Sequence, residues 1–108
     1  SRKDRGFFCV PAGSPTELCP PIILCESAID ALSALSLHPD HRCISTSGAR
    51  PNPAWLGPLI EQGARVYCGF DADQTGERMA QAMIAFHPSV QRLRPHCHDW
   101  NDTLKSDP

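Results

Sequence analysis

The fold is constrained most by a repeated order of strand-like runs and helix-forming segments. Continuous apolar runs are typical of strands that are covered on both faces. Strand-like runs, the last one weaker and alternating, occupy residues 22–25, 42–46, 65–70 and 90–94. Helix-forming segments lie between them, at residues 28–37, 53–63 and 75–86. This alternation predicts an α/β fold with a parallel sheet and helices on both of its faces.

The first helix-forming segment carries Ile29, Leu32 and Leu35 at helical spacing. Such spacing predicts an amphipathic helix that turns its apolar side toward the sheet. Ala31 and Ala34 are small enough to allow close packing of this helix.

A length of 108 residues suits one domain with a single core. We expect this core at 22–105, preceded over 1–21 by a short strand (6–10) and a proline-rich loop, and we expect the chain to be part of a longer protein. Its 41% hydrophobic and 20% charged residues are typical of a soluble globular protein. A net charge of -2 excludes a broad basic face. Nucleic-acid binding would therefore depend on a bound metal, a local basic patch or flanking domains.

The cysteines and the apolar runs bear on the cellular compartment. None of the 6 cysteines forms a Cys-x-x-Cys pair, and three of them lie in strand-like runs, so we expect buried thiols in a reducing cytosol. Zinc at His96-Cys97-His98 is disfavoured because neighbours on an extended chain point to opposite faces and a second ligand pair is missing. There is no signal peptide and no apolar run of about 20 residues. A cytoplasmic protein without a membrane segment is expected.

Acidic and small residues follow directly after the predicted strands. Asp71 and Asp73 are spaced i, i+2, so both project to the same side of an extended chain. Glu26 follows the first strand, Ser47-Gly48 the second and Asp99 the last. The carboxyl ends of parallel strands share one edge of the sheet, where open α/β folds build their sites. A rim of carboxylates is therefore predicted at this edge.

Clustered carboxylates repel one another unless a cation is present. Mg²⁺ prefers such oxygen ligands and bridges to phosphate oxygens, and Mn²⁺ can substitute for it. Glu26, with Asp30 one helical turn beyond it, lies where a carboxyl can donate or accept the proton of a sugar hydroxyl. Ser47, Gly48 and the nearby backbone N–H groups could hold a substrate phosphate, with Arg50 as its partner.

Each of these residues also has a structural interpretation. Glu26 and Asp30 would complement a helix dipole, and Asp73 would cap a helix. Asp99 would form a turn, and Arg50 would be a solvated loop residue. These separate roles do not explain why all the acids fall on one rim.

Segments of the chain, taken together in order, resemble a Toprim domain. They are residues 22–33 (IILCESAIDALS), 45–48 (STSG), 69–76 (GFDADQTG) and 99–102 (DWND). Toprim domains are shared by bacterial primases, type IA and type II topoisomerases, OLD-type nucleases and RecR-like proteins. The resemblance is closest to the primase-like type of plasmids, other mobile elements and phages. It implies a Rossmann-like three-layer fold with about four mostly parallel strands.

The resemblance also implies roles for individual residues. It makes Glu26 the general acid/base, Asp71 and Asp73 the Mg²⁺ ligands, and Asp30 and Asp99 supporting acids of the metal site.

Two positions depart from the Toprim pattern. Ser27 stands where many Toprim domains have Gly, which narrows the approach of a ligand to the backbone. Asn101 falls where a primase often has a second acid, and Asp102 follows one residue later, which indicates a weaker second metal site.

The function implied is Mg²⁺-dependent nucleotidyl transfer by the catalytic domain of a primase-like DNA replication protein. Its partners would be DNA or RNA, nucleotides, and flanking zinc-binding or helicase domains. A nuclease that hydrolyses phosphodiesters with the same acids is one alternative, and a non-catalytic module that binds nucleic acid or protein is another. A topoisomerase is disfavoured because Tyr67 lies in a predicted core strand.

Overall fold

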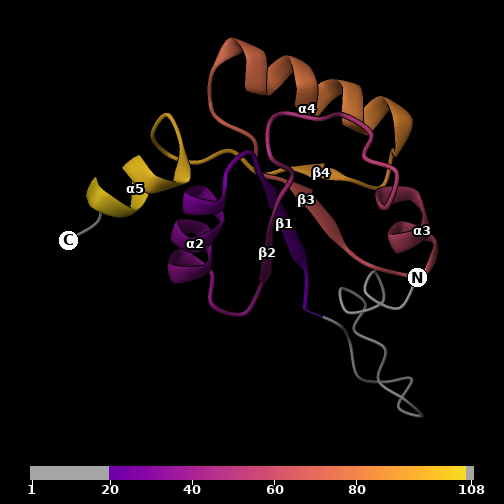
Figure 1. Cartoon of the computed structure of the whole chain (residues 1–108), viewed down its shortest axis with the longest axis horizontal. Helices are drawn as coiled ribbons and strands as arrows, with labels where there is room; N and C mark the ends of the chain where they lie inside the picture. Colours follow the sequence, from indigo (N-terminus) through magenta and orange to yellow (C-terminus); the bar gives the residue numbers. More distant parts are fainter. Residues whose placement is uncertain (1–19, 107–108) are drawn as a thin grey trace.

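The computed structural model describes residues 20–106, which form a parallel sheet flanked by helices (Figure 1). The strand predicted at 6–10 lies outside the described residues. The predicted α/β fold with a parallel sheet is confirmed. In chain order the elements are β1 (Ile22–Cys25), α2 (Ala28–Leu37), β2 (Arg42–Ser45), α3 (Leu56–Glu61), β3 (Val66–Cys68), α4 (Gln74–Phe86), β4 (Gln91–Arg92) and α5 (Trp100–Ser106).

The strands are arranged in the order β2-β1-β3-β4, and every pairing is parallel. β1 lies in the middle, with Ile22 opposite both Arg42 of β2 and Val66 of β3. β4 is short and pairs only with the end of β3. The carboxyl ends of all four strands therefore meet at one edge, as the sequence predicts.

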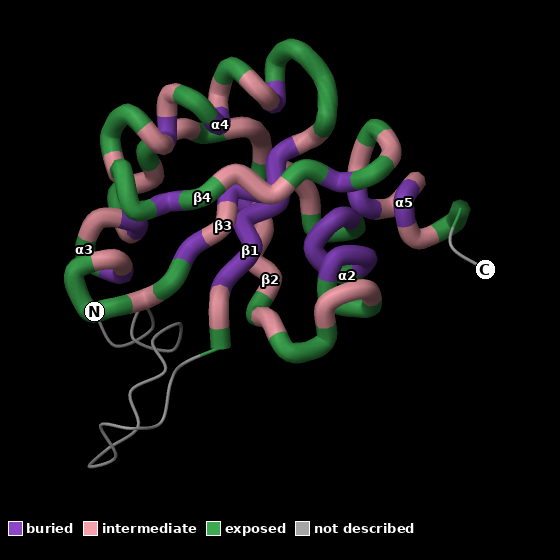
Figure 2. The backbone as a smooth tube through the Cα atoms, turned by 180° about the vertical axis from the view of Figure 1, so that it is seen from behind, coloured by how far each residue is buried: buried purple, intermediate pink, exposed green. Residues whose placement is uncertain are grey.

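Each face of the sheet has its own hydrophobic core, because successive side chains of a strand point to opposite faces. Ile22 and Leu24 of β1 pack with α3 and α4, whereas Ile23 and Cys25 pack with α2 and Trp100. Figure 2 shows β1 buried along its length between these layers.

Trp100 anchors α5 to the second face. Its side chain is 3% exposed, and its Nε1 donates a hydrogen bond to the Gly69 carbonyl oxygen at 2.8 Å. Gly69 leaves room for this contact, since a Cβ there would lie 2.7 Å from Ile23 Cγ2 and 2.9 Å from Trp100 Nε1.

The orientation of α2 corrects the expectation from its apolar spacing. Ile29, Leu32 and Leu35 are 58%, 66% and 41% exposed, and the sheet side is formed by Ala31 and Ala34. Hydrogen bonds to α5 explain this orientation of α2. Two side chains on the buried side of α2 bond to α5: Asp30 accepts the Asn101 N–H at 3.1 Å, and Ser33 donates to the Asn101 side chain at 3.4 Å. These bonds fix the rotation of the helix and leave its large apolar residues on the outside.

The predicted buried thiols are confirmed for Cys25 and Cys68, and Cys43 is partly buried. Burial raises the pKa of the Cys68 thiol to about 11, so this side chain behaves as a small apolar group. Between residues 20 and 106, no helix combines the length and apolar character that crossing a membrane requires.

Candidate metal centre

Asp71 stands at the centre of the carboxyl edge, directly beyond β3. Its backbone N–H donates to Glu26 Oε2 at 2.9 Å, which joins the ends of the adjacent strands β1 and β3. Its side-chain Oδ1 is buried and has no hydrogen-bond partner. A buried carboxylate oxygen without a partner is costly, and a bound cation is one of the few groups that would satisfy it.

Two further side chains meet Asp71 at this position. Ligand atoms of Asp71, His98 and Asp99 all lie within 4.8 Å of one another. Two carboxylates and one imidazole fit the ligand preferences of a divalent cation such as Mn²⁺, and the carboxylates also suit Mg²⁺. The two carboxylates therefore fit the Mg²⁺ that the sequence predicts, and the imidazole is better suited to Mn²⁺.

The predicted acids also converge electrostatically on Asp71. Burial, followed by the negative charges of Glu26, Asp30, Asp99 and Asp73, raises the pKa of Asp71 to about 6. The charges of carboxylates that follow separate strands thus interact with one another, as expected if these residues share one edge of the sheet.

Asp73 has the structural role that the sequence left open, that of the cap of α4. Its Oδ1 accepts the Gly76 N–H at 2.6 Å, and its Oδ2 bonds to His98 Nε2 at 2.8 Å. The Gly76 N–H, followed by the His98 ring, lowers the pKa of Asp73. Direct ligation of a metal by Asp73 stays a prediction.

Asp30 and Asp99 each combine a position near Asp71 with a structural contact. Asp30 is buried and accepts from the Ser27 hydroxyl at 2.9 Å, as well as from α5. Asp99 Oδ1 accepts the Asp102 N–H at 2.8 Å and caps α5, whereas its Oδ2 lies 3.9 Å from His98 Nδ1. Asp99 Oδ2 therefore lies on the side of His98 and Asp71.

The Ser47-Gly48 loop supports Glu26 from the other side. Ser47 and Gly48 have positive φ angles of 58° and 118°, and the Gly48 N–H donates to the Glu26 carbonyl oxygen at 2.6 Å. The N–H groups of Ser47 and Arg50 also donate within the loop, to Ser45 Oγ and to the Gly48 carbonyl oxygen. A phosphate site at Ser47, Gly48 and Arg50 stays a prediction. Because these N–H groups already donate hydrogen bonds to protein oxygens, the phosphate would be bound mainly by side chains.

Arg92 holds the segment that carries Asp71. Only 6% of its side chain is exposed. Its guanidinium donates to the carbonyl oxygens of Cys68 at 3.0 Å, Phe70 at 2.7 Å and Asp71 at 3.0 Å, and to Glu77 at 3.0 Å. This single cation fixes the end of β3 and the first turn beyond it.

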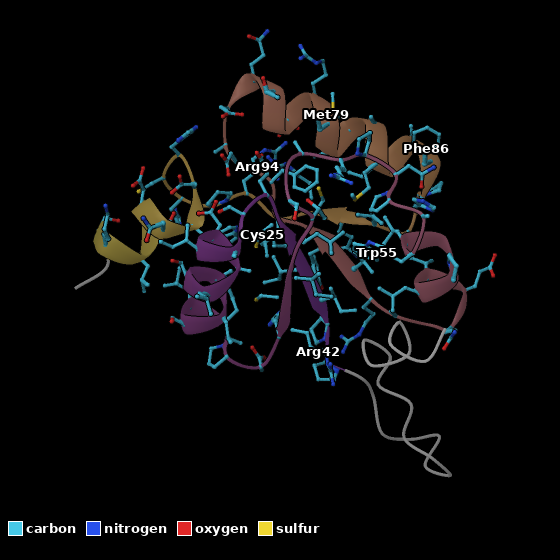
Figure 3. All side chains as sticks on the ribbon, in the orientation of Figure 1. Cys25, Arg42, Trp55, Met79, Phe86 and Arg94 are labelled. Carbon is cyan, nitrogen blue, oxygen red and sulfur yellow. The ribbon has the colours of Figure 1, made fainter. Side chains whose placement is uncertain are left out.

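Arg94 lies at the same edge (Figure 3). Its side chain pairs with Glu77 at 2.7 Å. Next to this pair is an open cavity of about 510 Å³. Its lining residues are Ala72, Asp73, Gln74, Glu77 and Arg94.

Comparison with known proteins identifies the family. The family model described as Toprim-like matches residues 23–104. The chain belongs to the Toprim-like family. The resemblance noted in the sequence is thereby confirmed.

A solved structure from bacteriophage T7 shares the Toprim-like fold. In it the lagging-strand DNA polymerase interacts with the primase domains of two gp4 subunits bound to an RNA/DNA hybrid and dTTP. The match has a TM-score of 0.66 at 19% identity and covers 80% of this chain and 47% of that chain. The Toprim-like chain therefore spans about half the length of the solved chain that it matches. No curated protein matches its sequence.

Two residues of the candidate site, Arg92 and His98, were not predicted from the sequence. Arg92 falls in a short edge strand, where nothing local indicates that its side chain is buried. His98 entered only as part of a disfavoured zinc cluster, although its position directly before Asp99 was a usable signal.

Proposed function

We propose that this chain is a Mg²⁺-dependent, primase-like nucleotidyl-transfer domain that acts on nucleic acid. The observation that carries the proposal is the buried, unpartnered Oδ1 of Asp71, which lies beside Asp99 and Glu26 at the carboxyl edge of the sheet. Membership of the Toprim-like family and the fold shared with a phage primase domain support it.

Asp71 and Asp99 would hold the divalent cation. The carboxylates repel one another at neutral pH, and this repulsion favours a site that takes up positive charge. The ion, when bound, neutralises and orients nucleotide phosphate oxygens. The chain itself supplies the rigid frame, since Arg92 holds the backbone of Asp71 and α5 holds Asp99.

Glu26 is the proposed general acid/base. Its Oε2 accepts the Asp71 N–H, which keeps the carboxylate within reach of a group bound beside Asp71. There it would accept the proton of an attacking 3′-hydroxyl, a role worth about 10²–10⁴-fold in rate.

The substrates follow from this chemistry. Ser47, Gly48 and Arg50 on one side and the cavity beside Asp73 on the other are proposed to receive nucleotide phosphates. The net charge of -2 leaves little electrostatic attraction for a DNA or RNA template. Grip on the template is therefore assigned to flanking zinc-binding or helicase domains of a longer protein.

The test compares Asp71→Asn with Asp40→Asn. Asp40 is 82% exposed and lies in the turn between α2 and β2, away from the carboxyl edge. Calorimetry with Mg²⁺ and Mn²⁺ should detect binding to the wild type and to Asp40→Asn, and at least tenfold weaker binding to Asp71→Asn. Absence of metal binding to the wild type at millimolar metal would leave only a binding module.

The reaction is then assayed on single-stranded DNA with nucleotides, with the chain joined to its flanking domains. Metal-dependent incorporation that is lost in Asp71→Asn supports nucleotidyl transfer. Metal-dependent nicking without incorporation would assign the same acids to a nuclease.

A further inference from the structure

His98 brings an imidazole to the acids, although it lies 25 residues or more from Asp71 and Asp73 in the sequence. The contact is fixed at the backbone, because the Ala72 N–H donates to the His98 carbonyl oxygen at 2.7 Å. This bond joins the loop before α5 to the loop between β3 and α4. The side chain itself is 54% exposed, so it is not held there by burial.

The two ring nitrogens of His98 face different groups. Nε2 lies 2.8 Å from Asp73 Oδ2, and Nδ1 lies 3.9 Å from Asp99 Oδ2. An ionised carboxylate only accepts hydrogen bonds, so the short contact places a proton on Nε2. In the neutral ring the lone pair is then on Nδ1, which faces Asp99; Asp71 belongs to the same group of ligand atoms.

Asp73 is arranged to orient this ring. One of its oxygens accepts the Gly76 N–H and the other accepts from His98, so both oxygens are engaged. A carboxylate behind the far nitrogen is the usual partner of a histidine that ligates a metal, because it fixes the tautomer and makes the ligand nitrogen more basic.

We infer that His98 is a ligand of the metal through Nδ1, together with Asp71 and Asp99, and that Asp73 orients His98 instead of ligating the ion directly. The inference rests on the metal site of the proposed function and changes its ligand set. An imidazole ligand suits Mn²⁺ better than Mg²⁺, because nitrogen ligands favour transition metals. The site should therefore bind Mn²⁺ more tightly than Mg²⁺.

Mn²⁺ binding to the 108-residue chain tests the inference without any activity assay. Loss of the aqueous Mn²⁺ signal in electron paramagnetic resonance gives the affinity, and pulsed measurements detect a directly bound ¹⁴N nucleus. We expect ¹⁴N coupling in the wild type. His98→Ala should lose this coupling and bind at least tenfold more weakly, whereas the control His96→Ala, in the same loop, should keep both.

Asp73→Asn separates orientation from ligation. Asn remains a good helix cap, so α4 is preserved, but its amide no longer accepts from His98 in the same way. We expect the ¹⁴N coupling to persist while Mn²⁺ affinity falls about 10–100-fold, the usual cost of losing a carboxylate behind a ligating histidine. Circular dichroism melts should be nearly unchanged for His98→Ala, since the ring is half exposed.

The failures can be told apart. Mn²⁺ bound by the wild type without ¹⁴N coupling, or with the affinity unchanged in His98→Ala, overturns the histidine ligand and leaves the carboxylate site of the proposed function standing. Complete loss of binding in Asp73→Asn together with unchanged binding in His98→Ala makes Asp73 the direct ligand. No Mn²⁺ binding by the wild type overturns both proposals.

Discussion

Arg92 offers the sharpest test of how the fold supports the site. Replacing Arg92 with Met keeps much of the apolar stem but removes the donors to Cys68, Phe70, Asp71 and Glu77. The three carbonyl contacts are partly buried and charge-assisted, and such a bond contributes about 1.5–3 kcal/mol. Relaxation of the loop and entry of water offset part of their sum. We expect Arg92→Met to lower the free energy of unfolding by about 3–4 kcal/mol.

Arg94→Met is the matched control. Arg94 binds the same Glu77 carboxylate, yet its side chain is 56% exposed, so water screens this ion pair and it contributes little to the free energy of unfolding. Each variant leaves Glu77 one arginine, so the difference between them isolates the contacts of Arg92 to the backbone carbonyls.

Urea denaturation followed by circular dichroism measures both variants. For a domain of this size, about 1 kcal/mol corresponds to about 4–8 °C in Tm, so Arg92→Met should melt at least about 12 °C below the wild type. Mn²⁺ affinity should fall as well, because Asp71 loses its backbone support. A loss of stability no larger than that of Arg94→Met would refute the assignment of Arg92 as the residue that fixes this segment.

Three more substitutions probe the same edge of the sheet. Gly76→Ala should destabilise the chain by about 1–3 kcal/mol in urea, because the added Cβ overlaps the Asp71 carbonyl oxygen, whereas Gly57→Ala, with 3.7 Å to its nearest neighbour, should be neutral or stabilising. Asp71→Asn in EDTA at pH 7.5 should be more stable than the wild type, since ionisation of Asp71 costs stability as the pH rises from 3.8 to about 6, and this cost is fully present at pH 7.5; equal or lower stability would contradict this. The pKa of Glu77 is lowered to about 2, chiefly by the hydrogen bond from Arg94. Ionised Glu77 therefore stabilises the fold at pH values above its ordinary pKa of 4.5, and this contribution is lost as the pH falls through about 2. Acid titrations of Glu77→Gln should accordingly have a shallower loss of stability over that interval.

The proposed ligand set has a consequence for the Asp-x-Asp motif. In this structure Asp71 and Asp73 follow the same strand but have different surroundings. Asp71 keeps a buried oxygen without a partner, whereas both oxygens of Asp73 are engaged. The second aspartate, Asp73, would support metal binding indirectly, by orienting His98.

Much of the fold could be predicted from local pattern alone. The strand at Ile22–Cys25 is a continuous apolar run and is buried along its length, and β3 beside it is a shorter run of the same kind. The neighbour on the other side, β2, is less apolar because it forms an edge of the sheet. Once the sheet is parallel, Glu26 and Asp71 must lie near one edge wherever the intervening helices lie. Asp99 lies well beyond the end of β4, and its loop is held at this edge by the hydrogen bond from the Ala72 N–H to the His98 carbonyl oxygen.

The rotation of α2 could not be predicted in this way. Its apolar spacing at Ile29, Leu32 and Leu35 indicates the opposite side from the one that packs. The deciding bonds run from Asp30 and Ser33 to Asn101, which is 71 and 68 residues further along the chain. No local pattern encodes partners at that separation.

The sequence by itself determined which acids would gather, because strand ends and parallel topology follow from patterns a few residues long. Only the tertiary structure decided what each acid does there. In the folded chain one side-chain oxygen of Asp71 has no hydrogen-bond partner, and both oxygens of Asp73 are bonded to Gly76 and His98. Arg92 is buried against the backbone that follows β3. The physical reason is that the role of a carboxylate depends on its hydrogen-bond partners. Here the decisive partners come from segments that are distant in sequence and meet only when the sheet is formed.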